Sequence, residues 1–374
     1  MNKMPTIALF AAHFPPCPGG ISKFMGITAE ALAQKGCKVI VVTSDFGDIG
    51  TLHPNVTVVK LPIHHWLPGS ERYPVPAWGT RAYSKAINVL RSSNIDRVIA
   101  LTRFHPTSHV AAKFASQQGI PLYLLECGAN RLTVNNRFLD AGINTVERLL
   151  TAKIRPAVHK WGAMSKAGGD FLKQEYGIES KFIWHCSIDV PDVVDRTENR
   201  DEVVITYSGR IENLKGEEEI ARSFSQLVKT YPNLRLNFLG DGSYLPTLKA
   251  NYIDDRITYM GNVGPNVVDA VNRSTDIFVC ATRFPDGAVP NAVLEAGAAK
   301  CAVITSPNGG FIDLMDDGRN GLLTAPNLGD MKECIERLIM DRDLRVRLAE
   351  ELYRDVKKLY RPDMVAESII NDMA

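Results

Sequence analysis

The chain has 374 residues, of which 45% are hydrophobic and 23% charged, and its 43 basic side chains nearly balance its 42 acidic ones. This length predicts two or three domains of about 150 residues each, and the apolar fraction excludes a disordered chain. No run approaches the roughly 18 consecutive apolar residues of a membrane-spanning helix. The charge is nevertheless divided, because residues 1–190 carry a net charge of +9 and residues 191–374 a net charge of −8. Such asymmetry indicates that the two halves meet different partners.

The seven cysteines are scattered, odd in number and without a C-x-x-C pair, which predicts neither a disulfide framework nor a zinc ribbon. The first apolar run begins near Thr6, is closed by His13 and two prolines, and is too short for a secretory signal. We expect this run to form the first β-strand, and we expect a cytoplasmic protein.

Short β-branched runs alternate with longer helical stretches, which is the pattern of parallel sheets covered by helices. The predicted strands are 6–12, 38–44, 56–61, 97–102, 121–127, 160–165 and 181–186 in the first half, and 203–209, 235–240, 257–263, 276–282 and 302–306 in the second. The polar, aperiodic segment 187–201 separates the two series. We therefore predict an α/β protein with two doubly wound Rossmann-like domains facing a central cleft. The N-terminal domain covers residues 1–188, the C-terminal domain covers residues 200–360, and the last helix, 361–374, packs back on the first domain.

The first predicted strand leads to Gly19 and Gly20, which open a helix. Ligands of open α/β sheets bind beyond the carboxyl ends of the strands. A helix N-terminus there offers free N–H groups, and glycine lets a phosphate approach closely. The pair predicts an anion site, although a plain strand-to-helix turn can have the same sequence.

The second half begins in the same way, with Gly209 and Arg210 after a strand and Lys215 at a helix start. Arg210 can bind a diphosphate through two parallel N–H groups of its guanidinium, and Lys215 can bind it through the single charge of its ammonium group. A solvated surface pair is the alternative. Glutamates 217–219 suit the positive end of the helix dipole, and we expect them to stay solvated.

A third element follows the strand that ends near Thr282. A loop, 286–291, leads into a helix that carries Glu295 about one turn inside. A carboxylate there can accept both hydroxyls of a ribose, and a glutamate favoured by the helix dipole is the alternative.

Together these segments carry a family resemblance. The matching motifs are P-x-x-G-G ending at Gly20, S-G-R-x4-K-G at 208–216, G-D-G at 240–242, P-N-A-V-L-E-A at 290–296, and the stretch 306–323 before a last short strand. On these motifs the chain resembles the retaining glycosyltransferases of the GT-B fold, within glycosyltransferase family 4, the glycosyl transferases group 1. The resemblance covers essentially the whole chain, in the family's order and separations.

The resemblance implies transfer of a sugar from a nucleoside-diphosphate-sugar donor to a saccharide or lipid-linked acceptor hydroxyl. The configuration would be retained, and the product would belong to surface polysaccharide or glycolipid synthesis. The C-terminal domain would bind the donor and the N-terminal domain the acceptor. No metal or other cofactor is implied, because the leaving phosphate itself would deprotonate the acceptor hydroxyl.

The resemblance also assigns roles to residues. Arg210 and Lys215 would hold the diphosphate, Glu295 would bind the ribose, and Gly19 and Gly20 would approach the donor pyrophosphate or the acceptor. The nucleobase pocket would be lined by Gly261, Asn262 and Val263. The sugar and phosphate would be wrapped by the backbone amides of a loop that consists of Asp286, Gly287, Ala288, Val289, Pro290 and Asn291.

Two departures from the family pattern concern the sugar. The first acid of the usual E-x7-E pair would stand at Gly287, so either Asp286 takes its place in a longer loop or that contact is missing. Cys127 stands where relatives often have a histidine, and Glu126 beside it is expected to touch the sugar or the acceptor. His105 and His109 are expected to contact the acceptor, with ordinary surface histidines as the alternative.

The segment 64–91 contains an aromatic, proline-rich loop and then a helix on which Arg81, Lys85, Asn88 and Arg91 share one face. The simplest interpretation is that these polar residues form the solvent-exposed face of the helix. The alternative is contact with an anionic membrane surface or with the phosphate of a polyprenyl-linked acceptor. No nucleic-acid-binding motif accompanies the charge.

Two further functions stay open. A sugar-nucleotide 2-epimerase on the same architecture would isomerise the donor without an acceptor, and a catalytically silent protein would bind the nucleotide sugar without turnover. A dehydrogenase is disfavoured because Gly240 and Gly242 lack the third glycine of the dinucleotide motif, and no P-loop is present.

Overall fold

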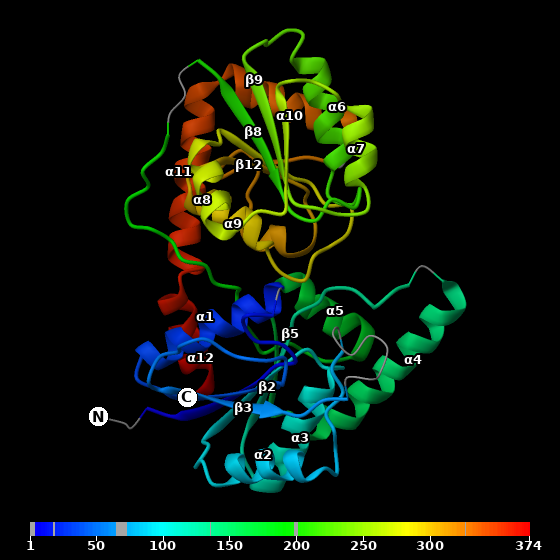
Figure 1. The fold of residues 1–374 in the computed structure, drawn as a ribbon, viewed down its shortest axis with the longest axis vertical. Coiled ribbons are helices and arrows are strands. Elements are labelled where there is room, and N and C mark those ends of the chain that lie inside the picture. Colours follow the sequence, from blue (N-terminus) through cyan, green and yellow to red (C-terminus); the bar gives the residue numbers. More distant parts are fainter. Residues whose placement is uncertain (1–3, 18, 65–72, 135, 198–200, 326) are drawn as a thin grey trace. The chain divides into compact units, whose positions relative to one another are not determined.

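The computed structural model describes residues 4–17, 19–64, 73–134, 136–197, 201–325 and 327–374. The chain divides into two compact units, each built on its own parallel sheet (Figure 1). Unit 1 comprises residues 1–187 and 362–374, and unit 2 comprises residues 188–361.

Unit 1 contains a seven-stranded sheet in the order β3-β2-β1-β4-β5-β6-β7. Its strands, all paired in parallel, are β1 (Thr6–Phe10), β2 (Lys38–Ser44), β3 (Val56–Leu61), β4 (Arg97–Leu101), β5 (Leu122–Glu126), β6 (Lys160–Ala163) and β7 (Phe182–Ile183). The helices are α1 (Gly20–Gln34), α2 (Arg81–Arg91), α3 (Pro106–Gln118), α4 (Arg137–Ile154), α5 (Lys166–Tyr176) and α12 (Pro362–Met373).

Unit 2 contains a six-stranded sheet in the order β10-β9-β8-β11-β12-β13. Its strands are β8 (Val203–Ser208), β9 (Leu234–Leu239), β10 (Ile257–Gly261), β11 (Ile277–Cys280), β12 (Ala302–Thr305) and β13 (Leu322–Leu323). The helices are α6 (Glu217–Leu227), α7 (Leu245–Asn251), α8 (Pro265–Ser274), α9 (Asn291–Ala298), α10 (Leu328–Met340) and α11 (Arg342–Leu359).

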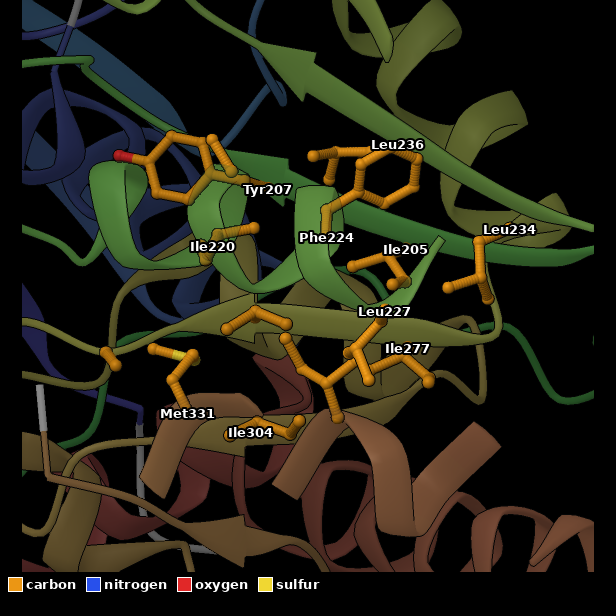
Figure 2. Packing of buried hydrophobic residues seen from close by; sticks show 14 of the residues in the cluster. Ile205, Tyr207, Ile220, Phe224, Leu227, Leu234, Leu236, Ile277, Ile304 and Met331 are labelled. Carbon is orange, nitrogen blue, oxygen red and sulfur yellow. The ribbon is translucent and has the colours of Figure 1, made fainter. Parts of the chain in front are cut away.

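The continuous apolar runs form strands because helices cover the sheets on both faces. In unit 2, Ile205, Ile277 and Ile304 of the sheet are fully buried against Phe224 of α6 and Met331 of α10 (Figure 2). The strand order reverses beside β1 and β8, so each sheet is doubly wound as predicted. Every predicted strand has a counterpart, several end one or two residues early, and the predicted strand 181–186 is reduced to Phe182–Ile183.

All seven cysteines are free thiols, so the prediction of no disulfide framework is confirmed. No helix within the described residues combines the length and apolar character that crossing a bilayer requires.

Candidate active site

The loop after β8 folds around one buried carboxylate. Glu217, the first residue of α6, is fully buried, and it accepts hydrogen bonds from the backbone N–H groups of Glu212 (3.1 Å) and Lys215 (2.8 Å). The hydroxyl of Tyr207 lies 3.1 Å from Glu217 Oε1 and 2.8 Å from the carbonyl oxygen of Arg210. The expectation that the glutamates at the start of α6 are solvated is therefore wrong for Glu217, and the side chains of Glu218 and Glu219 are also largely buried, at 15% and 12% exposed. A carboxylate at a helix N-terminus is stabilised by the dipole and by these donors, and here it shapes the loop.

This loop presents two cations. The Arg210 side chain is 72% exposed, and its Nη1 lies 3.6 Å from Glu212 Oε1. Lys215 Nζ lies 3.3 Å from Asp286 Oδ2, which joins the β8 loop to the loop after β11. Burial alone would lower the pKa of Lys215, but the charge and hydrogen bond of Asp286 together with the neighbouring groups Cys280 and Glu217 outweigh it, and the pKa is raised. Lys215 is therefore a fixed positive charge, while Arg210 can turn toward an anion.

The G-D-G motif sets the spacing between the loops after β8 and β9. A Cβ on Gly240 would lie 1.9 Å from the carbonyl oxygen of Gly209, and one on Gly242 would lie 2.1 Å from that of Ile211. The backbone N–H of Ile211 donates to the carbonyl of Asp241 (3.0 Å). Only glycine lets the backbones of these two loops come so close. The motif therefore positions the loop that carries Arg210 through backbone packing.

The loop 286–291 rests on a second glycine pair that sequence reasoning did not single out. A Cβ on Gly309 would lie 2.4 Å from the backbone nitrogen of Asp286, and one on Gly310 would lie 2.2 Å from the carbonyl carbon of Ala288. Gly310 N–H donates to the carbonyl of Asp286 (2.8 Å). The signal was present in the sequence, because both glycines lie in the stretch 306–323.

The other predicted donor residues lie in the same unit. Gly261 ends β10 and accepts a hydrogen bond from Gly240 N–H (2.7 Å), and Asn262 is exposed just beyond it. Val289 is buried, whereas the other residues of the loop 286–291 and Val263 are half-buried. Glu295 is half-buried on α9. The structure thus brings the loops after β8, β9, β10 and β11 together at the carboxyl edge of one sheet, where open α/β sheets bind ligands.

Gly19 and Gly20 belong to unit 1 and open α1. Both are exposed, and a Cβ added to either would meet nothing within 4 Å. Gly19 has φ +125°, which a larger residue rarely adopts, and the first turn of α1 contains no acidic residue. The free N–H groups of this turn are therefore open to an anion.

The side chain of Glu126 is buried and is not exposed to solvent. Its carboxylate is 1% exposed, lies 2.8 Å from Nη1 of the equally buried Arg103, and accepts a hydrogen bond from Gly128 N–H (3.0 Å). Arg103 also pairs with Glu147 (3.1 Å). A direct contact of Glu126 with a sugar stays a prediction, while the observed bonds of its carboxylate reach the backbone N–H groups of Gly128, just after Cys127, and of Arg103.

The three remaining predicted residues of unit 1 are mostly screened from water. Burial and the charge of His13 lower the pKa of His105 to about 4, so its imidazole is neutral at pH 7. Burial and the charge of Lys153 lower the pKa of His109. Burial and the Glu126 carboxylate raise the pKa of Cys127 to about 12, so this thiol is protonated and is a poor nucleophile.

The predicted basic face of the segment 64–91 is partly described, because residues 65–72 lie outside the described chain. Arg81, Lys85, Asn88 and Arg91 are all exposed on α2. The helix is capped by Thr80, whose hydroxyl accepts from Tyr83 N–H (3.2 Å).

Residues 202–341 match the family model described as Glycosyl transferases group 1. An uncharacterized glycosyltransferase of Methanocaldococcus jannaschii is 23% identical over 377 residues, which cover 96% of this chain and 95% of that relative. The capsular polysaccharide biosynthesis glycosyltransferase CapM of Staphylococcus aureus is 30% identical over 180 residues, 45% of each chain. The structure of Anabaena HepE in complex with UDP and glucose matches with a TM-score of 0.71 at 15% identity, over 99% of both chains.

These comparisons confirm the predicted fold class, because two parallel-sheet Rossmann-like units are the architecture of GT-B structures. The matched residues of unit 2, from 202 to 341, form a glycosyl transferases group 1 domain.

Proposed function

We propose that the protein transfers a sugar from a nucleoside-diphosphate-sugar donor to an acceptor hydroxyl with retention of configuration. The observation that carries the proposal is the pair of cations on the β8 loop, one exposed (Arg210) and one fixed by Asp286 (Lys215). They lie within the group 1 domain, and a protein of similar fold is described in complex with UDP and glucose.

In this proposal unit 2 holds the donor. Arg210 and Lys215 bind the diphosphate and stabilise the negative charge that grows on it as the glycosidic bond breaks. Glu295 accepts the ribose hydroxyls, and the backbone of residues 261–263 lines the nucleobase pocket. The backbone N–H groups of residues 287–289 and 291 face the sugar and phosphate, and Gly19 and Gly20 of unit 1 offer backbone N–H groups to the pyrophosphate or the acceptor.

Asp286 has a supporting role in this chemistry. Because its carboxylate lies 3.3 Å from Lys215 Nζ, it orients the ammonium group. We assign it the first place of the family's acidic pair, one residue earlier than usual. Its replacement by Ala would then leave Lys215 charged and misplaced.

The chemistry needs no carboxylate pair at the reacting carbon. The leaving phosphate oxygen takes the proton of the acceptor hydroxyl, while the enzyme orients both partners and stabilises the leaving group. Since the two cations supply the positive charge, we propose that no divalent metal is required. Full activity in the presence of EDTA is the expected result, and loss of activity that Mg²⁺ restores would contradict it.

The acceptor is proposed to be a saccharide or a polyprenyl-linked sugar, bound by unit 1 near His105, His109 and Cys127. The exposed basic face of α2 would attract its phosphate or an anionic membrane surface. CapM, a partial relative, is named for capsular polysaccharide biosynthesis, which supports a role in surface polysaccharide or glycolipid synthesis. Seven free thiols favour a reducing compartment, so we place the protein in the cytoplasm, at the inner face of the membrane.

The test is a screen of the purified chain against a panel of nucleotide sugars, first by thermal shift and then with candidate acceptors. The expected results are stabilisation by one donor and an acceptor-dependent product whose anomeric proton coupling in NMR matches the donor. An inverted anomer would overturn retention. Isomerisation of the donor alone would identify the 2-epimerase, and binding without hydrolysis or transfer would identify the silent binding protein.

A further inference from the structure

The loop that connects β8 to α6 is bonded to a carboxylate of its own chain. Glu217 Oε1 accepts the N–H of Glu212 (3.1 Å) and Glu217 Oε2 accepts the N–H of Lys215 (2.8 Å), so both oxygens are used. Asn213, which lies between these two donors, has φ +57°, a left-handed conformation that residues other than glycine seldom adopt. Such a conformation persists only where its surroundings determine it. The two hydrogen bonds on either side of Asn213 fix the chain there.

Glu217 is itself fixed from the core of unit 2. It is fully buried, and its Oε1 also lies 3.1 Å from the hydroxyl of Tyr207. Tyr207 belongs to β8 and is fully buried beside α6 (Figure 2). The same hydroxyl lies 2.8 Å from the carbonyl oxygen of Arg210. This buried pair of side chains therefore contacts the backbone of both cations of the loop, at the carbonyl of Arg210 and at the N–H of Lys215.

Other N–H groups of the loop are bonded within the protein as well. Gly209 N–H donates to the carbonyl of Leu239 (2.9 Å), and Ile211 N–H donates to that of Asp241 (3.0 Å). With the two that Glu217 accepts, four of the seven N–H groups from Gly209 to Lys215 are used. A typical anion-binding loop directs such groups at its ligand. Here an internal carboxylate takes two of them.

The loop therefore offers an anion its side-chain charge more than its backbone. The Arg210 side chain is 72% exposed, and Lys215 Nζ lies 3.3 Å from Asp286 Oδ2. A guanidinium and an ammonium group bind one ligand tightly when both are in place beforehand, because ordering them during binding costs affinity. The backbone positions from which these two side chains extend are the ones that Glu217 and Tyr207 contact.

We propose that Glu217 is a positioning residue, which occupies N–H groups that the loop could give to a phosphate and thereby fixes the backbone from which Arg210 and Lys215 reach the donor diphosphate. The inference rests on the proposed function, because that function assigns the diphosphate to these two cations. The diphosphate is then bound by the two side chains, and the N–H groups of Glu212 and Lys215 stay with Glu217.

The informative variant is Glu217→Gln, which keeps the shape of the side chain. An amide has one acceptor oxygen, so its NH₂ group must face one of the two N–H donors, and a hydrogen bond to a charged group is lost. The matched control is Glu218→Gln at the next position of α6, where the side chain is 15% exposed. The hydrogen-bond partners of Glu218 among the described residues are Arg222, Tyr244 and Tyr252, which lie outside the loop.

The first measurement is hydrogen–deuterium exchange of the full chain without ligand, followed by mass spectrometry. Exchange in residues 210–216 should be about tenfold faster or more in Glu217→Gln, and it should stay at the wild-type rate in Glu218→Gln. Tyr207→Phe is a milder second variant, which removes the hydroxyl that contacts Glu217 and should speed exchange in the same segment. Wild-type exchange of this segment in both Glu217→Gln and Tyr207→Phe would overturn the proposal.

The second measurement is the affinity for inorganic pyrophosphate by isothermal titration calorimetry. Glu217→Gln should bind about tenfold more weakly or less, whereas Glu218→Gln should bind like the wild type. A purely structural role would lower the melting temperature of both variants without separating their affinities. Wild-type affinity in Glu217→Gln would overturn the positioning role alone. Absence of wild-type binding, or undiminished binding by Arg210→Ala, would instead refute the proposed function, and the exchange rates would still decide whether Glu217 fixes the loop.

Discussion

The side chain of Arg210 contributes little to the stability of the folded state. Its side chain is 72% exposed and its nearest carboxylate is 3.6 Å away, an arrangement worth at most about 1 kcal/mol. Lys215 is tied to Asp286 instead. Removing Arg210 therefore separates ligand binding from stability more cleanly than removing Lys215.

We predict that Arg210→Ala lowers kcat/KM for transfer by about 10²-fold or more, because it removes a cation from the leaving diphosphate. The free energy of unfolding should change by less than about 0.5 kcal/mol. Initial rates and urea unfolding check the two parts. The control is Arg354→Ala on α11, whose side chain is 66% exposed and pairs with Glu351. Wild-type turnover by Arg210→Ala would refute its assignment.

His105 makes the free energy of unfolding depend on pH, in a direction that follows from its pKa. Its pKa is about 4 in the folded protein and 6.5 in the unfolded chain, so the unfolded chain binds more protons between these values. The neutral imidazole of His105 therefore contributes stability to the folded state that is fully present above pH 6.5. This contribution is lost as the pH falls toward 4, and the loss amounts to up to about 3 kcal/mol. Urea unfolding at a series of pH values measures it.

The matched variant is His105→Gln, in which this part of the pH slope should disappear while the contributions of other groups remain. His159→Gln serves as the control substitution. An unchanged slope in His105→Gln would show that other groups cause the acid sensitivity.

At the scale of elements, the loops at the carboxyl edge of the unit 2 sheet are spaced by glycines rather than by side chains. Gly242 is the informative position because its φ lies outside the positive range, so adding a methyl group tests packing alone. The methyl would collide with the backbone of Ile211, on the loop that carries Arg210.

We predict that Gly242→Ala destabilises unit 2 by about 1–3 kcal/mol, the usual cost of overpacking, and also reduces donor affinity. Unfolding followed by circular dichroism and thermal shift with the identified donor measure these effects. Gly264→Ala is the matched control, because Gly264 has φ −72° and a methyl group added there would meet nothing within 4 Å. Equal effects from both variants would contradict the packing role of the motif.

The sequence alone was sufficient to predict the strands and the loops that follow them, because hydrophobic periodicity and turn residues are local signals. It was insufficient where partners are distant along the chain. Arg103 meets Glu126 and Glu147, which are 23 and 44 residues away, and no local pattern shows that such a charge is buried. Glu217 is one of three consecutive glutamates, and only tertiary packing shows that it is the fully buried one.

The apolar residues of α4 show a second limit of local patterns. Phe138 and Leu149 follow a helical period that normally indicates the core, so periodicity alone cannot show that they face water. The candidate donor loops, by contrast, combine glycine and charge in motifs, and their positions followed from the order of the strands.

At the scale of the molecule, the last helix completes unit 1 rather than unit 2. α12 buries Val365, Ala366, Ile369 and Met373, and Asp372 accepts a hydrogen bond from Trp184 Nε1 (2.7 Å). All four tryptophans of the chain precede residue 187, so tryptophan fluorescence reports unit 1 alone.

We predict that ending the chain at Arg361 destabilises unit 1 by several kcal/mol, since it exposes the surface that α12 covers. Asp372→Ala should cost about 1–2 kcal/mol through the lost bond to the buried Trp184. Fluorescence-monitored urea unfolding measures both changes, with Asn371→Ala as the control. An unchanged fluorescence transition in the truncated chain would show that α12 is dispensable.

The return of α12 also has a consequence for synthesis on the ribosome. Unit 2 is one continuous stretch, 188–361, whereas unit 1 is assembled from both ends of the sequence. Unit 2 can therefore fold as soon as it emerges, while unit 1 waits for the final residues with part of its surface uncovered. During translation unit 1 is synthesised first but stays incomplete until α12 has been made. In this interval its uncovered apolar surface is the part of the chain that a chaperone would bind.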